Sequence, residues 1–175
     1  MARIRGAKEH AARLRRLTSP EAANVLTQAL FTVGQNVQTD AQTSITTGAV
    51  SGNSHKPSAP GTPPNNDSGT LANNIETIIA GPLHVQVTSN APYAAIQEFG
   101  GTINHPGGTA YFIGDGGLAV FVPDSSILST YLPRTKPHTI TLPERPYMRP
   151  AVAKNRKPGI ELVRKAVNKL LSGTK

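Results

Sequence analysis

A long run of apolar residues at helical spacing is the strongest pattern in the chain. Ser19-Pro20-Glu21 offers a capping hydroxyl, a proline suited to the first turn and an acid at the positive end of the helix dipole. Apolar side chains then recur every three or four residues, at Ala22, Leu26, Ala29, Leu30, Val33, Val37, Ala41 and Ile45. The pattern predicts one helix over about residues 20–46. Gly34 weakens that helix locally, which favours a close approach by another element there.

Two further helices are predicted near the ends of the chain. A basic helix is expected within residues 1–18, because a narrow apolar stripe runs through Ile4, Ala7, Ala11 and Leu14. A C-terminal helix is expected with Pro158 near its first turn and Gly173 closing it. Its apolar stripe consists of Ile160, Val163, Val167, Leu170 and Leu171.

Between the helices, the pattern changes to the alternation of β-strands. Two hairpins are predicted, from residues 75–80 with 84–89 and from 110–113 with 118–122, the second joined by Gly114-Asp115-Gly116-Gly117. A short helix over 92–99 and a last strand over 138–142 complete the order. Because strands follow one another directly, they cannot all belong to parallel βαβ units. We therefore expect an α+β fold: an antiparallel sheet of about four to five strands packed by the long N-terminal helix and the C-terminal helix.

The segment 47–69 interrupts this order with glycine, proline, serine and asparagine, and it has almost no side chain to bury. We expect a mobile loop at 47–69, with residues 47–66 irregular. Residues 19–175 are expected to form a single domain, preceded by the basic helix of residues 1–18.

Charge is distributed unevenly along the chain, whose net charge is +8. Residues 1–17 carry +5, residues 18–133 carry −6 and residues 134–175 carry +9. Two basic ends around an acidic middle suggest either a nucleic-acid footprint or complementary surfaces that meet between subunits, where salt would weaken them. The simpler alternative is that lysine and arginine only solvate two terminal helices.

Residues for catalysis or metal binding are hard to find. The chain has no cysteine, and its five histidines are scattered without metal-ligand spacing. The glycine-rich stretches lack the features of phosphate or dinucleotide loops, and no apolar run approaches the roughly 20 residues that span a bilayer. Asp115 with Asp124, or Glu98 with Glu76, could be paired carboxylates, but solvated acids are commoner. We predict no catalytic, cofactor-binding or metal-binding residue and no enzyme activity; a small hydrolase using Asp115 or Asp124 is a distant alternative.

Three stretches, taken in order, resemble a known family. The first runs from Pro60-Gly61-Thr62-Pro63-Pro64 through Asp67-Ser68-Gly69-Thr70-Leu71 to Asn74-Ile75. The second is Ala91-Pro92-Tyr93-Ala94-Ala95-Ile96-Gln97-Glu98-Phe99-Gly100-Gly101, and the third is Leu142-Pro143-Glu144-Arg145-Pro146-Tyr147-Met148-Arg149-Pro150-Ala151. Together they are similar to motifs of the neck and tail-completion proteins of long-tailed bacteriophages, over roughly residues 19–172.

The resemblance implies a structural virion protein of the phage neck, assembled in the host cytoplasm. Such a protein would form a homo-oligomeric ring, with a hexamer favoured and a dodecamer second, around non-specifically contacted packaged DNA. Its partners would be head-closure or connector proteins on one side and tail tube or tail terminator proteins on the other. The alternatives are a tail terminator or tail-completion ring at the top of the tail tube, and a sequence-independent nucleic-acid-binding protein.

The second and third stretches supply the candidate interface residues, which are Tyr93, Glu98, Phe99, Arg145, Tyr147 and Arg149. Tyr93, Ile96 and Phe99 would share one face of the short helix, which favours core packing over an interface anchor. Of Arg145 and Arg149, we expect one to form a salt bridge within the subunit, with Glu98 as a candidate partner, and the other to contact a neighbouring subunit.

Overall fold

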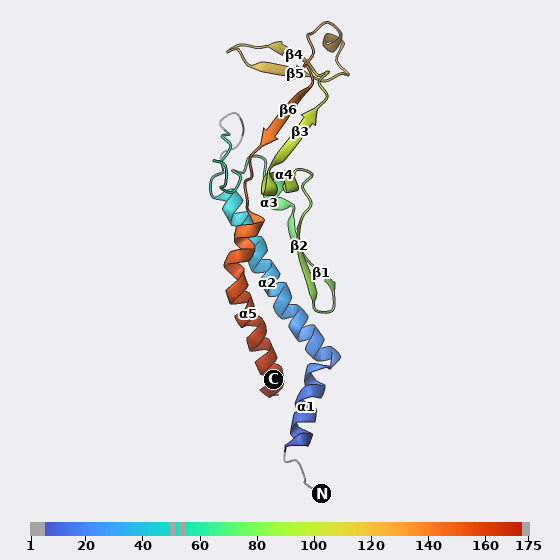
Figure 1. Ribbon diagram of the computed structural model, residues 1–175, viewed down its shortest axis with the longest axis vertical. Helices are drawn as coiled ribbons and strands as arrows, with labels where there is room; N and C mark the ends of the chain where they lie inside the picture. Colours follow the sequence, from blue (N-terminus) through green and yellow to red (C-terminus); the bar gives the residue numbers. More distant parts are fainter. Residues whose placement is uncertain (1–5, 50–51, 53–54, 173–175) are drawn as a thin grey trace. The chain divides into compact units, whose positions relative to one another are not determined.

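The computed structural model describes residues 6–49, 52 and 55–172, which group into two compact units. Met1–Phe99 and Glu144–Lys175 make up unit 1, and Gly100–Pro143 makes up unit 2. Unit 1 holds α1 (Ala7–Leu17), α2 (Pro20–Thr46), α3 (Thr70–Asn73), β1 (Ile75–Gly81), β2 (His84–Ser89), α4 (Ala94–Phe99) and α5 (Met148–Ser172) (Figure 1). Unit 2 holds β3 (Gly101–His105), β4 (Ala110–Ile113), β5 (Ala119–Val122), the 3-10 helix η2 (Ile127–Thr130) and β6 (His138–Leu142).

The expected α+β class is confirmed, but the expected single sheet is wrong. The strands form three two-stranded antiparallel sheets, β1–β2, β3–β6 and β4–β5. Both predicted hairpins are present. The last predicted strand is β6, and it pairs with β3, a strand after Gly100 that the sequence pattern did not predict. Thr102, Asn104, Thr139 and Thr141 share one face of the β3–β6 ribbon, and Ile103, Ile140 and Leu142 share the other. Alternation along a strand shows which side chains share a face but not which strands pair, so it could not distinguish one sheet from separate two-stranded sheets.

The long helix begins and ends where the apolar spacing predicts. α2 starts at Pro20, and the Ser19 hydroxyl accepts a hydrogen bond from the Ala22 amide at 3.1 Å. This side chain satisfies one of the amides that a helix start leaves unpaired. α2 lies along α5 on one side and along the β1–β2 hairpin on another (Figure 1).

The C-terminal helix begins ten residues earlier than predicted, at Met148, and Pro158 lies inside it. Proline suits a first turn, and this local rule misplaced the start of the helix. The true start depends on a side chain from a distant part of the sequence, Glu98, whose contacts are described below.

The core of unit 1 forms where four helices meet the first strand. Val37, Ala41 and Ile45 of α2 pack against buried residues of α3, β1, α4 and α5 and of the connections between them; these are Leu71, Ala72, Ile75, Ala91, Ala94, Tyr147 and Ala151. Two glutamines on α2 hold the chain beside it: Gln38 Nε2 donates to the Ile75 carbonyl at 2.9 Å, and Gln42 Nε2 donates to the Ala72 carbonyl at 3.0 Å. These polar contacts fix α3 and the start of β1 against the helix.

In segment 47–69, residues 47–49, 52 and 55–69 are described and contain no strand. Residues 50, 51, 53 and 54 lie outside the described part of the chain, as do residues 1–5 of the predicted basic helix. The segment is attached at two points: the Gly61 amide donates to the Glu144 carbonyl, and the Asn66 amide donates to the Ile45 carbonyl.

Two glycines allow α2 to be approached closely from both sides. A Cβ added at Gly34 would lie 2.6 Å from Thr77 Cγ2 of β1, and one at Gly159 of α5 would lie 2.8 Å from Val33 Cγ1 of α2. The close approach expected at Gly34 is therefore present. Glycine is required at these positions for packing, since a methyl group would push the hairpin or α5 away from α2.

Gly34→Ala is expected to destabilise the protein. Alanine gains roughly 1 kcal/mol in helix propensity, but overpacking against the β-branched Thr77 costs about 1–3 kcal/mol. Urea unfolding followed by circular dichroism should show a net loss, whereas Asn24→Ala on the exposed face of α2 should not. A Gly34→Ala variant more stable than the parent would contradict the packing described here.

Candidate functional site

A buried carboxylate joins the second and third motifs. Glu98, only 4% exposed, lies at the end of α4 beside the first turn of α5. Its Oε2 accepts the Tyr147 amide at 2.8 Å and the Met148 amide at 2.9 Å, and its Oε1 accepts the Arg149 amide at 2.9 Å. Three backbone donors at the start of α5 are thus satisfied by one distant side chain.

Arg149 completes this arrangement from the same turn of α5. Its Nε donates to Glu98 Oε1 at 3.0 Å, and its Nη2 donates to the Glu98 carbonyl at 2.8 Å and to Glu144 Oε2 at 2.7 Å. The guanidinium carbon also lies 5.2 Å from the centroid of the Phe99 ring, within the range of a cation–π contact. The expected salt bridge to Glu98 is present, and it is formed by Arg149.

These contacts determine the charge state of Glu98. Burial acts to raise the pKa of its carboxyl, but hydrogen bonds from the Met148, Tyr147 and Arg149 amides and from the Arg149 side chain outweigh burial and lower the pKa. A carboxylate whose pKa is lowered by folding stabilises the fold above its ordinary pKa of about 4.3. This contribution is lost as the pH falls through the lower value of the folded state.

Glu98→Gln is expected to lower the free energy of unfolding at pH 7 by about 2–4 kcal/mol, because the amide group presents its own N–H to buried N–H donors. The parent protein should also lose stability as the pH falls below about 5, and the variant should lose less of it. Urea unfolding across this pH range measures both effects.

Glu144→Gln is the matched control, since it removes the exposed partner of Arg149 and leaves the buried carboxylate in place. It should change stability little. Equal losses for the two variants would contradict the capping role of Glu98.

All three motifs converge on this junction. Arg145 lies half-buried; its amide donates to the Gln97 carbonyl at 2.7 Å, and its Nε donates to the Ser58 carbonyl at 3.0 Å. Tyr147, 2% exposed, packs in one core with Leu71 and Ile75 of the first motif. Both arginines are therefore engaged within the subunit, and a contact of either with a neighbouring subunit stays a prediction.

The short helix buries a different face from the one predicted. α4 buries Ala94 and Glu98, while Tyr93 is 39% exposed and Phe99 is 65% exposed. The core-packing interpretation of Tyr93 and Phe99 is wrong, because the long-range contacts of Glu98 orient the helix and outweigh its apolar spacing. Tyr93 and Phe99 are left as exposed aromatic side chains, available as interface anchors.

Phe99→Ala should therefore change the free energy of unfolding by less than about 1 kcal/mol, the loss expected for an exposed cation–π contact. Tyr147→Ala, in the same junction, should cost about 3–5 kcal/mol because it empties a fully buried site. Thermal melts of the two variants separate these cases. A large loss for Phe99→Ala would show that the ring is buried in the native protein.

Acidic residues of the middle segment pair with basic residues of the C-terminal segment inside one subunit. Besides Glu98 with Arg149, Asp40 Oδ1 lies 2.7 Å from Lys154 Nζ, and Asp124 Oδ1 lies 3.0 Å from Arg134 Nη1. Ion pairs within one subunit thus compensate part of the opposite charge of the middle and C-terminal segments. The further pairing between subunits, with its sensitivity to salt, stays a prediction.

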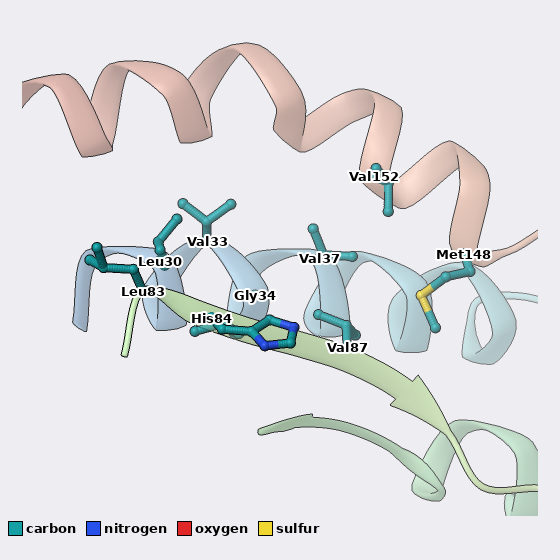
Figure 2. A pocket seen from close by; sticks show the side chains of 10 residues that line it. Leu30, Val33, Gly34, Val37, Leu83, His84, Val87, Met148 and Val152 are labelled. Atoms are coloured by element: carbon teal, nitrogen blue, oxygen red, sulfur yellow. The ribbon is translucent and has the colours of Figure 1, made fainter. Parts of the chain in front are cut away.

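An apolar groove of about 380 Å³ lies between α2 and α5; we call it the α2/α5 groove. It is lined by Leu30, Val33, Val37, Val152, Asn155, Arg156, Gly159, Ile160 and Val163. A second hollow of about 380 Å³ extends from it along β2, and Figure 2 shows Val152 of α5 projecting toward Val37 of α2 in the region they share. Val152 and Ile160 are about half exposed, so apolar side chains line a surface open to solvent.

Unit 2 also exposes apolar side chains. Among its residues only Ala110, Val122 and Ser129 are buried. Its exposed large apolar residues are Ile103, Phe112, Ile113, Leu118, Val120, Phe121, Ile127, Leu128, Tyr131 and Ile140. The sequence pattern predicted the β4 and β5 strands, but it could not show that their apolar side chains next to the turn would be exposed on both faces.

Among the described residues, no three histidine or acidic side chains gather as a metal site would require. Asp115 and Asp124, the carboxylates of the distant hydrolase alternative, show no arrangement of that kind, and Asp124 is engaged with Arg134. No helix in the described part of the chain is long and apolar enough to cross a membrane.

Comparison with known proteins gives no assignment: no family model, curated protein or solved structure matches this chain.

Proposed function

We propose that this protein is a structural subunit of a phage neck, forming a homo-oligomeric ring that joins the head connector to the tail around the DNA passage. A ring of six is the first expectation and a ring of twelve the second. The tail terminator or tail-completion ring is the nearest variant of the proposal. The subunit works by binding its neighbours and performs no catalysis.

The observation that carries this proposal is the convergence of the three motifs on the Glu98 junction. Residues that resemble the family's motifs build one structural joint, in which Glu98 links α4 to α5 and Tyr147 fills the core. Motif residues that fix one helix against another and fill the core support a structural role for the protein. A catalytic motif would instead gather reactive side chains in a cleft.

Exposed apolar surface supports the same proposal. Both the α2/α5 groove and the β4–β5 hairpin present apolar side chains to solvent. Contiguous apolar surface of this kind is typical of sites that a protein partner covers. A subunit that exists mainly inside an assembly would carry such surfaces.

The proposal is tested by native mass spectrometry and negative-stain microscopy of the purified full chain, which should show closed rings of six or twelve. Lysates lacking the protein should accumulate separate filled heads and tails, and the purified protein should restore their joining. A monomer at all concentrations, together with normal joining in its absence, would overturn the proposal.

One observation favours the second candidate, sequence-independent binding of nucleic acid. α1 contacts α5, and both helices carry exposed basic residues. On α1 these are Lys8, Arg13, Arg15 and Arg16, and on α5 they are Arg149, Lys154, Arg156, Lys157, Arg164, Lys165 and Lys169. Such a surface could face the DNA inside a ring, or it could be the protein's main binding site.

Salt dependence distinguishes the two candidates. If nucleic-acid binding is the main role, affinity for random-sequence duplex DNA should fall steeply with salt, with a log–log slope of about −0.9 for each phosphate contacted. Replacing Arg164 and Lys165 by alanine should then reduce the slope. Rings that form and join heads to tails without measurable DNA affinity would exclude this candidate.

A further inference from the structure

The β4–β5 hairpin of unit 2 is apolar on both faces. Alternation along the strands places Phe112 and Val120 on one face, and Ile113 and Phe121 on the other. All four side chains are exposed, and Leu118, immediately before the returning strand, is 74% exposed. Ala110 and Val122 at the base of the hairpin are buried, but the half next to the turn leaves both faces open to solvent. A two-stranded ribbon is marginal by itself, and this exposed half needs an outside surface to cover it.

The α2/α5 groove is a surface of matching chemistry in the same chain. It is elongated between two helices, and its lining is aliphatic except for Asn155 and Arg156. Within it, Gly159 of α5 has no Cβ, so the Val33 side chain of α2 packs directly on the α5 backbone. An apolar ribbon with branched and aromatic side chains fits such a groove better than a charged helix would.

From these two surfaces we infer that the β4–β5 hairpin of one subunit docks in the α2/α5 groove of the next. This contact rests on the proposed ring and specifies how its subunits bind. It is heterologous, since two different surfaces meet, and repeated contacts of this type close into a ring when the rotation between subunits allows it. The occupant of the groove is thus a second copy of this chain.

Charge complementarity supports this choice. Asp115 lies in the turn of the hairpin, Arg156 lies at the groove, and neither has a salt-bridge partner among residues 6–49, 52 and 55–172. The groove helix α5 carries seven basic residues and one acid, Glu161, and its net positive charge suits a hairpin whose only charge is an acid. The acid at the tip would orient the hairpin, and the apolar side chains would supply most of the binding.

The contact is tested with single-cysteine variants, because the chain contains no natural cysteine. Leu118→Cys on the hairpin and Ile160→Cys in the groove are produced together in one cell, with a tag on one chain that separates the three possible dimers on a gel. A short bis-maleimide crosslinker bridges thiols too far apart for a disulfide. We expect the mixed dimer to predominate, and to fall severalfold when Ala153→Cys, exposed on α5 outside the groove, replaces Ile160→Cys.

Each other result overturns the contact. Dimers of Leu118→Cys with itself would mean that hairpins meet one another in an isologous interface. Rings visible by microscopy without the mixed dimer would place the hairpin elsewhere and leave the proposed neck function standing. A protein that neither crosslinks nor forms rings would reject both the contact and the proposed ring.

A charge variant provides an independent measurement. Leu118→Glu alters a side chain that is mostly exposed, so it should keep the parent's circular dichroism and melting temperature while shifting the assembly to smaller species on a sizing column. Ser125→Glu adds the same charge to an exposed turn of unit 2 away from the hairpin and should leave the assembly intact. Equal behaviour of the two variants would contradict docking of the hairpin.

Discussion

Unit 1 depends on the hydrogen bonds between Glu98 and the first turn of α5. Pro146 and Pro150 have no backbone N–H, and the three residues between them donate theirs to this one carboxylate. The carboxylate also favours the positive end of the helix dipole, and Arg149 compensates its charge. Because Glu98 belongs to α4 and the donors belong to α5, the interaction joins segments about fifty residues apart. Unit 2 is inserted between these two segments.

Two glycines, Gly34 of α2 and Gly159 of α5, determine how closely the neighbouring elements pack against α2. With the start of α5 held in place, the helix runs beside α2 and meets Val33 at Gly159, while the hairpin meets α2 at Gly34. Both contacts are close because neither glycine has a Cβ, so a side chain of the neighbouring element packs directly on its backbone. The aliphatic side chains that flank Gly159 line the α2/α5 groove.

The two units are stabilised unequally, which bears on the proposed role in assembly. Unit 1 has a contiguous core, whereas unit 2 buries few side chains and relies on ladder hydrogen bonds and the Arg134–Asp124 pair. Exposed ladders and few apolar contacts are typical of regions that open easily. A segment of this kind gains order when a partner covers it, and a ring subunit offers that partner in the form of its own neighbour.

Local pattern in the sequence determined the α+β class, α2 with its Ser19 cap, both hairpins and the close approach at Gly34, because spacing, capping and turn residues act over a few positions. The start of α5, the orientation of α4 and the pairing of β3 with β6 were decided by tertiary structure. Pro158 predicted a later start for α5, and the apolar spacing of Tyr93 and Phe99 predicted that another face of α4 would be buried. The hydrogen bonds of Glu98 outweighed both local signals. A buried carboxylate must satisfy its hydrogen bonds wherever donors can be brought to it, and no local pattern records which distant amides those will be.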